Sequence, residues 1–239
     1  MIDFDDLAVD DISRHFGRRR ALSHITFRAP RNTILGLLGP NGAGKSTMLA
    51  MLATLLRPSD GRIRYGSHEA GTHGPELRAA IGVLGHDLFL YPELTARENL
   101  AFFAGLHGIT DAGDAALAAL ERAGLADRAD DPVSSFSRGM RQRVALERAL
   151  IHGPRLVLLD EPFTGLDDAS SAALVARLNG LRESGAIVVL ATHDLDLAEG
   201  LLDRAVFLRD GRMVDAIERP EALRATYRAV MTRARVGSV

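Results

Sequence analysis

A glycine-rich segment has the residue types and spacing needed to bind a nucleoside triphosphate. It matches the pattern G-x-x-x-x-G-K-[ST] and reads Gly39-Pro40-Asn41-Gly42-Ala43-Gly44-Lys45-Ser46-Thr47. Glycines let backbone amides close on phosphates, and a helix that begins at Lys45 directs its positive end at the same anion. Lys45 is placed to reach the β- and γ-phosphates, and the Ser46 hydroxyl is placed to coordinate Mg²⁺. The segment therefore predicts a nucleotide site.

Two carboxylates follow a continuous apolar stretch later in the chain. Residues 156–159 read as a buried strand, and Asp160 and Glu161 come directly after it. Asp160 stands where a Mg²⁺-bound carboxylate belongs. Glu161 faces another side, as neighbours on a strand do, and is placed to polarise an attacking water as a general base. The alternative is two surface acids at a strand end. The presence of the glycine-rich motif in the same chain disfavours this alternative.

The elements that must position these motifs alternate between apolar strands and helices. We expect strands at residues 34–38, 81–84, 156–159, 187–190 and 205–208. We expect helices at residues 45–56, 96–106, 114–123, 137–151, 168–183 and 195–202. This alternation predicts an α/β fold, in which helices cover both faces of a mainly parallel sheet. Residues 1–217 then form one domain with a helical subdomain inserted at about 87–150, and residues 218–239 form a C-terminal helical tail.

Composition and charge exclude several classes of protein. The formal net charge of the 239 residues is −2, which does not favour nucleic acid as a partner. There is no cysteine, so disulfides, thiolate metal sites and a cysteine nucleophile are excluded. The N-terminus is acidic and lacks a signal-peptide pattern, and no apolar run approaches the roughly 20 residues of a membrane span. We therefore expect any link to a membrane to pass through another subunit.

The ordered series of motifs resembles the nucleotide-binding domain of ABC transporters, and the resemblance covers about Leu7 to Val214. It implies a P-loop NTPase core with a mainly parallel sheet and an inserted helical subdomain. It also implies an ATPase that takes ATP and Mg²⁺, acts as a head-to-tail homodimer and powers an integral-membrane transporter subunit. The implied location is cytoplasmic, peripheral on the inner face of the cell membrane.

The resemblance assigns a second anion site to the segment 136–140, where the family has its signature L-S-G-G-Q. Here it reads Phe136-Ser137-Arg138-Gly139-Met140. In the family this segment contacts the γ-phosphate bound by the other subunit. Ser137 reads as an N-cap with free amides behind it, and Gly139 still allows close backbone approach. The departures at Arg138 and Met140 are expected to affect the rate of hydrolysis more than ATP binding.

Three further residues are assigned by their order in the chain. Asp167, in Gly165-Leu166-Asp167, resembles the D-loop, which runs along the dimer interface. His193 resembles the switch histidine that senses the γ-phosphate, and we expect Glu161 and His193 together to handle the attacking water. Phe16 resembles the aromatic residue that stacks on adenine, with peripheral packing as the alternative.

His86 indicates which branch of the family this chain resembles. It occupies the place of a glutamine that touches Mg²⁺, and a neutral imidazole still binds a metal-held water. Gly85-His86, followed by residues 91–100, is similar to the ATP-binding subunits of haem exporters of cytochrome c maturation, the CcmA family. A CcmB-like membrane partner is then expected. The short stretch after Val214 is further expected to set the chain apart from longer drug-export and sugar-import ATPases.

Other interpretations remain open at this point. The chain could power an ABC exporter of other cargo, such as a drug or a lipid. It could instead be a non-transport soluble ABC ATPase or a binding module without turnover. A set of apolar residues serves equally well as a seat for the membrane partner or as core of the helical subdomain: Leu88, Phe89, Leu90, Phe102 and Phe103.

Overall fold

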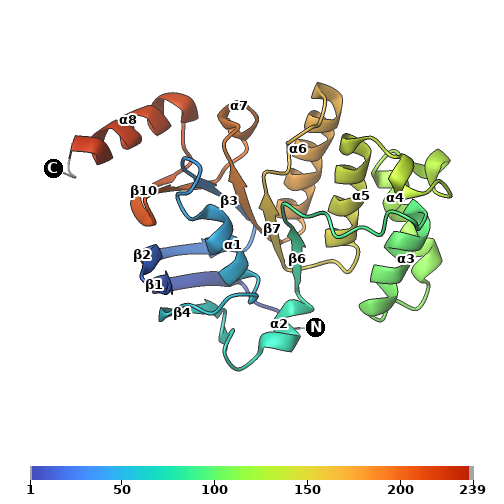
Figure 1. The fold of residues 1–239 in the computed structure, drawn as a ribbon, viewed down its shortest axis with the longest axis horizontal. Coiled ribbons are helices and arrows are strands. Elements are labelled where there is room, and N and C mark those ends of the chain that lie inside the picture. Colours follow the sequence, from blue (N-terminus) through green and yellow to red (C-terminus); the bar gives the residue numbers. More distant parts are fainter. Residues whose placement is uncertain (1, 237–239) are drawn as a thin grey trace.

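A computed structural model describes residues 2–236, with side chains for residues 2–233, so the last three residues of the predicted tail lie outside the described residues. Its centre is a six-stranded sheet in the order β10-β9-β3-β8-β7-β6 (Figure 1). All neighbours are parallel except β10, which pairs antiparallel with β9. The expected α/β fold with a mainly parallel sheet is therefore confirmed. The strands are β3 (Thr33–Leu38), β6 (Ile81–Leu84), β7 (Leu156–Asp160), β8 (Ile187–Thr192), β9 (Arg204–Arg209) and β10 (Arg212–Glu218).

A second, antiparallel sheet lies beside the first and was not expected from the sequence. Its order is β2-β1-β4-β5. The alternating burial of Ile25, Phe27 and Ala29 shows that its strands bury only one face. Such strands alternate between apolar and polar residues, so they contain no continuous apolar run by which to recognise them. They are β1 (Asp6–Phe16), β2 (Arg19–Pro30), β4 (Asp60–Tyr65) and β5 (His68–Glu69).

The expected helices lie near their positions, two of them end earlier than expected, and the short helix at Gly74–Arg78 was not expected. The helix expected at 45–56 ends at Leu52, and Thr54 then takes a positive φ of 59°. The helix expected at 195–202 ends at Ala198, before Gly200 with φ of 73°. The helices are α1 (Lys45–Leu52), α2 (Gly74–Arg78), α3 (Ala96–Leu106), α4 (Ala112–Arg122), α5 (Arg138–Leu150), α6 (Asp168–Glu183), α7 (Leu195–Ala198) and α8 (Leu223–Val236), with short 3₁₀ turns at Ala126–Arg128 and Val133–Ser135.

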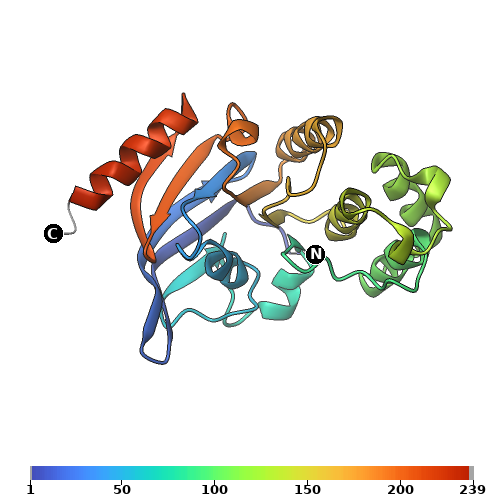
Figure 2. The same ribbon diagram turned by 45° about the horizontal axis from the view of Figure 1, so that its top comes forward.

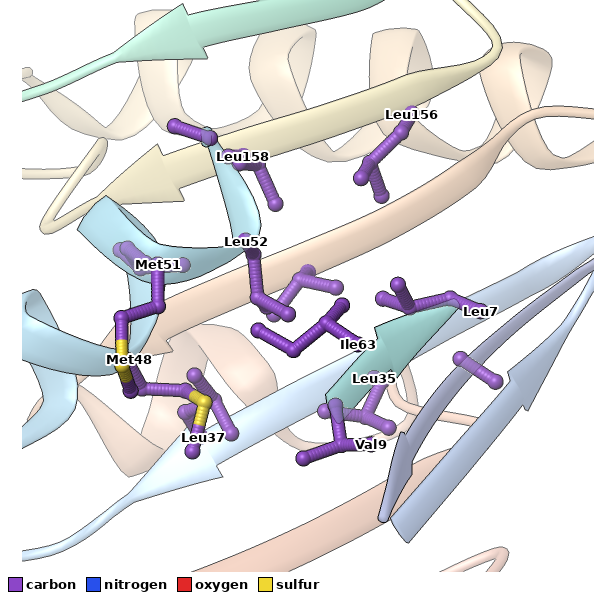
Figure 3. Close-up of a cluster of buried hydrophobic side chains, with 14 of the residues drawn as sticks. Leu7, Val9, Leu35, Leu37, Met48, Met51, Leu52, Ile63, Leu156 and Leu158 are labelled. Atoms are coloured by element: carbon purple, nitrogen blue, oxygen red, sulfur yellow. The ribbon is translucent and has the colours of Figure 1, made fainter. Parts of the chain in front are cut away.

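The main core fills the space between the two sheets and α1, as Figure 3 shows. Alternate residues of one strand serve opposite faces: Leu35 and Leu37 face this core, whereas Ile34 and Leu38 face a second core under α5, α6 and α7. Helices therefore cover both faces of the six-stranded sheet. The residues labelled in the close-up are Leu7, Val9, Leu35, Leu37, Met48, Met51, Leu52, Ile63, Leu156 and Leu158.

The segment between β6 and β7 has its own core. Its helices α3 and α4 pack with the start of α5 around Leu100, Leu120 and Phe136. Both ribbon views place α3 and α4 at the end of the molecule opposite α8 (Figures 1 and 2). No helix in the described part of the chain is long and apolar enough to cross a membrane.

Candidate nucleotide-binding site

The phosphate loop, residues 39–47, connects the end of β3 to the start of α1. Its backbone is left-handed at Gly42 and Gly44, where φ is 79° and 102°. At Gly44 a Cβ atom would also lie 2.5 Å from Cδ2 of Leu22, so only glycine fits there without a shift. No side chain caps the start of α1, and its first amides stay free to bind an anion.

Lys45 is the only lysine of the chain, and it is buried within the phosphate loop. Its Nζ donates hydrogen bonds to the carbonyl oxygens of Gly39, at 2.8 Å, and Pro40, at 3.3 Å. No carboxylate in the described part of the chain forms an ion pair with it. Loop carbonyls therefore hold the ammonium group in place, and its charge stays available to a phosphate.

Glu161, directly after β7, is held by the loop that follows β8. Its backbone is left-handed, with φ of 51°. Its Oε2 lies 2.8 Å from Nδ1 of His193 and accepts hydrogen bonds from the backbone N–H of His193, at 3.2 Å, and from Oγ1 of Thr192, at 3.3 Å. The two residues expected to handle the attacking water are thus in direct contact.

A cavity of about 540 Å³ brings most of the predicted residues together. The phosphate loop forms one side of this cavity, and the ends of β6 and β7 provide His86, Asp160 and Glu161. Gly39, Pro40 and Ala43 belong to the same loop but do not line the cavity. The predicted residues that line it are Asn41, Gly42, Gly44, Lys45, Ser46, Thr47, His86, Asp160 and Glu161.

The oxygen donors in this cavity fit Mg²⁺ that is bound together with a nucleotide. Ser46 offers a hydroxyl and Asp160 a carboxylate, whereas His86 offers an imidazole that suits a metal-held water better than the ion itself. The described residues contain no group of three or more histidines and acids that could hold a metal by themselves. Mg²⁺ commonly takes one or two protein ligands and completes its shell with phosphates and water.

Sequence reasoning did not assign five other residues that line the cavity: Arg19, Arg20, Ala21, Asp210 and Gly211. Arg19, Arg20 and Ala21 begin β2, and Asp210 and Gly211 form the turn between β9 and β10. The run of three arginines at 18–20 was the available signal. The distance between these arginines and the phosphate loop depends on how the two sheets pack. A local sequence pattern does not predict that packing.

We expect Arg20→Ala to raise the KM for ATP about fivefold, because an exposed guanidinium beside the phosphate loop adds one charge-assisted contact. Steady-state phosphate release at low salt measures the change, which should shrink as salt screens the charge. Arg18→Ala, an exposed neighbour outside the cavity, is the matched control. Equal KM values for both variants would contradict the assignment.

Phe16 lies at the end of β1, outside the lining of this cavity. Its side chain is 47% exposed, and the guanidinium carbon of Arg14 lies 4.7 Å from the ring centroid. One face of the ring is thus covered by a cation. Stacking of Phe16 on adenine stays a prediction.

The signature segment and the expected D-loop also lie outside this cavity, next to each other. Ser137 caps α5, as its Oγ accepts a hydrogen bond from the backbone N–H of Met140 at 3.2 Å. A Cβ atom on Gly139 would lie 3.1 Å from the carbonyl oxygen of Gly165. The signature segment therefore lies against the start of the D-loop and does not line the nucleotide cavity of its own chain.

Asp167 caps α6 in the same region. Its Oδ1 accepts a hydrogen bond from the backbone N–H of Ser170 at 2.8 Å. The hydrogen bonds of Ser170, and to a smaller extent the charge of Arg143, lower the pKa of the Asp167 carboxyl. Asp167 is thus a charged cap at the start of α6.

The phosphate loop between a strand and a helix of a parallel sheet, with an acidic strand end beside it, defines a P-loop nucleotide-binding protein. Residues 22–164 match the ABC transporter family. The linearmycin resistance ATP-binding protein LnrL of Bacillus subtilis is 35% identical over 87% of this chain and 68% of that protein. The daunorubicin resistance ATP-binding protein DrrA3 of Streptomyces coeruleorubidus is 39% identical over 87% of this chain and 66% of that protein. The chain belongs to the ABC transporter family.

A solved structure agrees with this membership. A dimeric ATP-binding cassette in a post-hydrolysis state, bound to ADP and Pi, is 26% identical to this chain, with a TM-score of 0.81 over 90% of this chain and 99% of that one. The protein is therefore an ABC ATPase that binds ATP or ADP. ABC ATPase domains dimerise and work with a membrane transporter subunit.

The relatives bear on the expected branch of the family. The chain spans about two thirds of the length of the two resistance proteins, which are named for antibiotics. Their names do not support the expected haem-exporter branch. Drug-resistance ATPases, which the length of the chain was expected to set apart, are among its relatives.

Proposed function

We propose that two copies of this chain hydrolyse ATP with Mg²⁺ and power a separate membrane subunit that exports a small organic molecule. The observation that carries the proposal is the joint placement of the phosphate loop, Asp160 and Glu161 in one cavity. The protein then works in the cytoplasm, peripheral on the inner face of the cell membrane, without a nucleic-acid partner.

Five residues of the cavity, and His193 next to Glu161, have separate tasks in this proposal. Ser46 and Asp160 hold Mg²⁺, and His86 binds a water of its shell. Lys45 stabilises the negative charge of the phosphates. Glu161 accepts a proton from the attacking water, while His193 orients the Glu161 carboxylate through the 2.8 Å contact. When bound, Mg²⁺ supplies charge neutralisation at the phosphates.

A second copy completes the site. Ser137, Gly139 and Asp167 lie outside the cavity of their own chain, and Ser137 binds only the Met140 amide among those at the start of α5. In a head-to-tail dimer they would reach the nucleotide on the partner's phosphate loop. Phe16 would stack on adenine with the ring face that Arg14 leaves open. Neither copy alone then forms a complete catalytic site.

The seat for the membrane subunit is an aromatic patch at the start of the helical segment. Phe89 and Phe102 are 64% and 44% exposed, and Tyr91 beside them is also exposed. Leu88 and Leu90 pack instead against the cores of the chain. Exposed aromatic residues gathered in this way favour an interface with another protein.

The identity of the transported molecule is the most specific part of the proposal. Resistance to linearmycin and daunorubicin in the names of two relatives favours an antibiotic-like molecule. His86, which lines the cavity at the position of the usual glutamine, favours the second candidate: a CcmA-type haem exporter with a CcmB-like partner. Specificity in either case would reside in the membrane subunit.

A pull-down from native membranes tests the proposal. Tagged Glu161→Gln protein is incubated with solubilised membranes and ATP, and the same protein without ATP is the control. We expect an integral-membrane protein to co-purify without haem absorbance. A haem-handling companion would move the assignment to cytochrome c maturation, and no membrane protein at all would favour a soluble ATPase. Phosphate release by the wild-type chain separates an enzyme from a module that only binds ATP.

A further inference from the structure

A second cavity lies between α5 and α6, away from the phosphate loop. Its volume is about 510 Å³, within the range of small-molecule sites, which spans about 300–1,000 Å³. We call it the α5–α6 pocket. It is lined by the end of α4, by one side each of α5 and α6, and by the loop after β7, and it shares no lining residue with the nucleotide cavity. None of the tasks proposed above uses it.

The inner wall of the α5–α6 pocket is apolar. It contains Leu84, Leu146 and Leu174, which are 1%, 8% and 5% exposed, and Leu166 from the loop after β7. Water against such a wall makes few hydrogen bonds, so an apolar group that displaces it gains free energy. The wall therefore suits a hydrocarbon chain or a ring.

The rim of the pocket is cationic. Arg122, Arg143 and Arg177 line it together with one carboxylate, that of Glu147. The Glu147 side chain is 3% exposed and is bound by Nε of Arg122, at 2.9 Å, and by Nε of Arg177, at 3.3 Å. Arg143 is thus the one guanidinium group of this lining that is not paired with the Glu147 carboxylate. It donates a hydrogen bond to the carbonyl oxygen of Ala123 at 2.6 Å and has other donors left.

We propose that the α5–α6 pocket binds an amphipathic organic anion. Its apolar part lies against the leucines, and its carboxylate or sulfonate accepts hydrogen bonds from Arg143. Three guanidinium groups against one carboxylate favour an anion over a cation. A nucleotide fits poorly, because the lining contains a single glycine, Gly124, and no glycine-rich loop for a polyphosphate.

A ligand in the α5–α6 pocket would lie beside a contact that joins α5 to the catalytic strand end. Gln142 of α5 lines the pocket and is 8% exposed. Its Nε2 donates a hydrogen bond to the carbonyl oxygen of Pro162 at 3.2 Å, one residue after Glu161. The same pocket reaches Ser170, whose backbone N–H donates a hydrogen bond to Oδ1 of the cap residue Asp167. The anion would therefore bridge the helical segment and the parts of the core that carry the proposed site.

Calorimetric titration of the full chain, without nucleotide, tests the pocket with dodecanoate as the probe. We expect one dodecanoate per chain with a Kd below about 1 mM. Dodecyltrimethylammonium has the same tail and the opposite charge, and it should bind at least tenfold more weakly. No dodecanoate binding in this range, or equal binding of both probes, would overturn the proposal.

Paired variants locate the binding. Ala172 and Ala173 are adjacent and exposed on α6, but only Ala173 lines the pocket. Ala173→Trp should abolish dodecanoate binding, and Ala172→Trp should leave it unchanged. Arg143→Gln should weaken binding about tenfold, whereas Arg141→Gln, an exposed change on the same helix, should not. If Ala173→Trp fails to fold by circular dichroism, the arginine pair decides. Unchanged affinity in Arg143→Gln would then refute the site. Because these titrations need no ATP, they are independent of the proposed catalytic role.

Discussion

The Glu161→Gln variant should bind ATP normally and hydrolyse it at least about a hundredfold more slowly than the wild type. General-base catalysis contributes about 10²–10⁴ to a rate, and an amide has no basic oxygen to accept the proton. Glutamine keeps the shape of the side chain and still accepts hydrogen bonds from the backbone N–H of His193 and from Thr192. Steady-state phosphate release measures kcat, and size-exclusion chromatography with ATP should show a persistent dimer.

Glu183→Gln is the matched control, because Glu183 is an exposed glutamate at the end of α6, away from the cavity. It should retain wild-type turnover, and its proportion of dimer should equal that of the wild type. Full activity in Glu161→Gln would remove Glu161 from the role of base. The carboxylate of another residue in the cavity would then have to act.

Lys45→Ala should lose most ATP affinity as well as turnover. The buried ammonium group is held at the phosphate loop by Gly39 and Pro40, and its contacts with phosphate would be charge-assisted hydrogen bonds. Losing contacts of about 1.5–3 kcal/mol raises Kd by roughly one to two orders of magnitude. Titration with a fluorescent ATP analogue measures the affinity, and phosphate release measures kcat.

Arg57→Ala controls for the loss of a positive charge, since Arg57 is an exposed cation shortly after α1. It should bind ATP as the wild type does. Retained affinity in Lys45→Ala would mean that backbone amides of the phosphate loop alone account for nucleotide binding. Thermal unfolding of both variants shows whether any loss of affinity comes from loss of folded protein.

The sequence predicts best the features that depend on residues close together in the chain. The phosphate loop needs glycines at positive φ and one lysine at a fixed spacing, and all of these fall within nine residues. Asp160 and Glu161 follow from an apolar strand and the two acids after it. The contact between Glu161 and His193 was expected only as a shared task, and the structure places the two side chains 2.8 Å apart.

Features that depend on packing between distant segments could not be predicted in the same way. Arg19 and Arg20 come near the phosphate loop because the antiparallel sheet packs on the central one through the shared core. The ends of α1 and α7 depend on positive φ angles at Thr54 and Gly200, for which only the glycine gives a sequence signal. The residues expected to act across a dimer stay predictions, because they concern a second copy.

The position of the only lysine has a practical consequence for work on this protein. Apart from the terminal amine, an amine-reactive reagent has a single target in the 239 residues, and that target is the Nζ of Lys45. Every acylated side chain then reports on the phosphate loop, and none on the surface. Mass spectrometry of one peptide thereby becomes a direct gauge of how often the nucleotide site is open, without a fluorophore or an engineered cysteine.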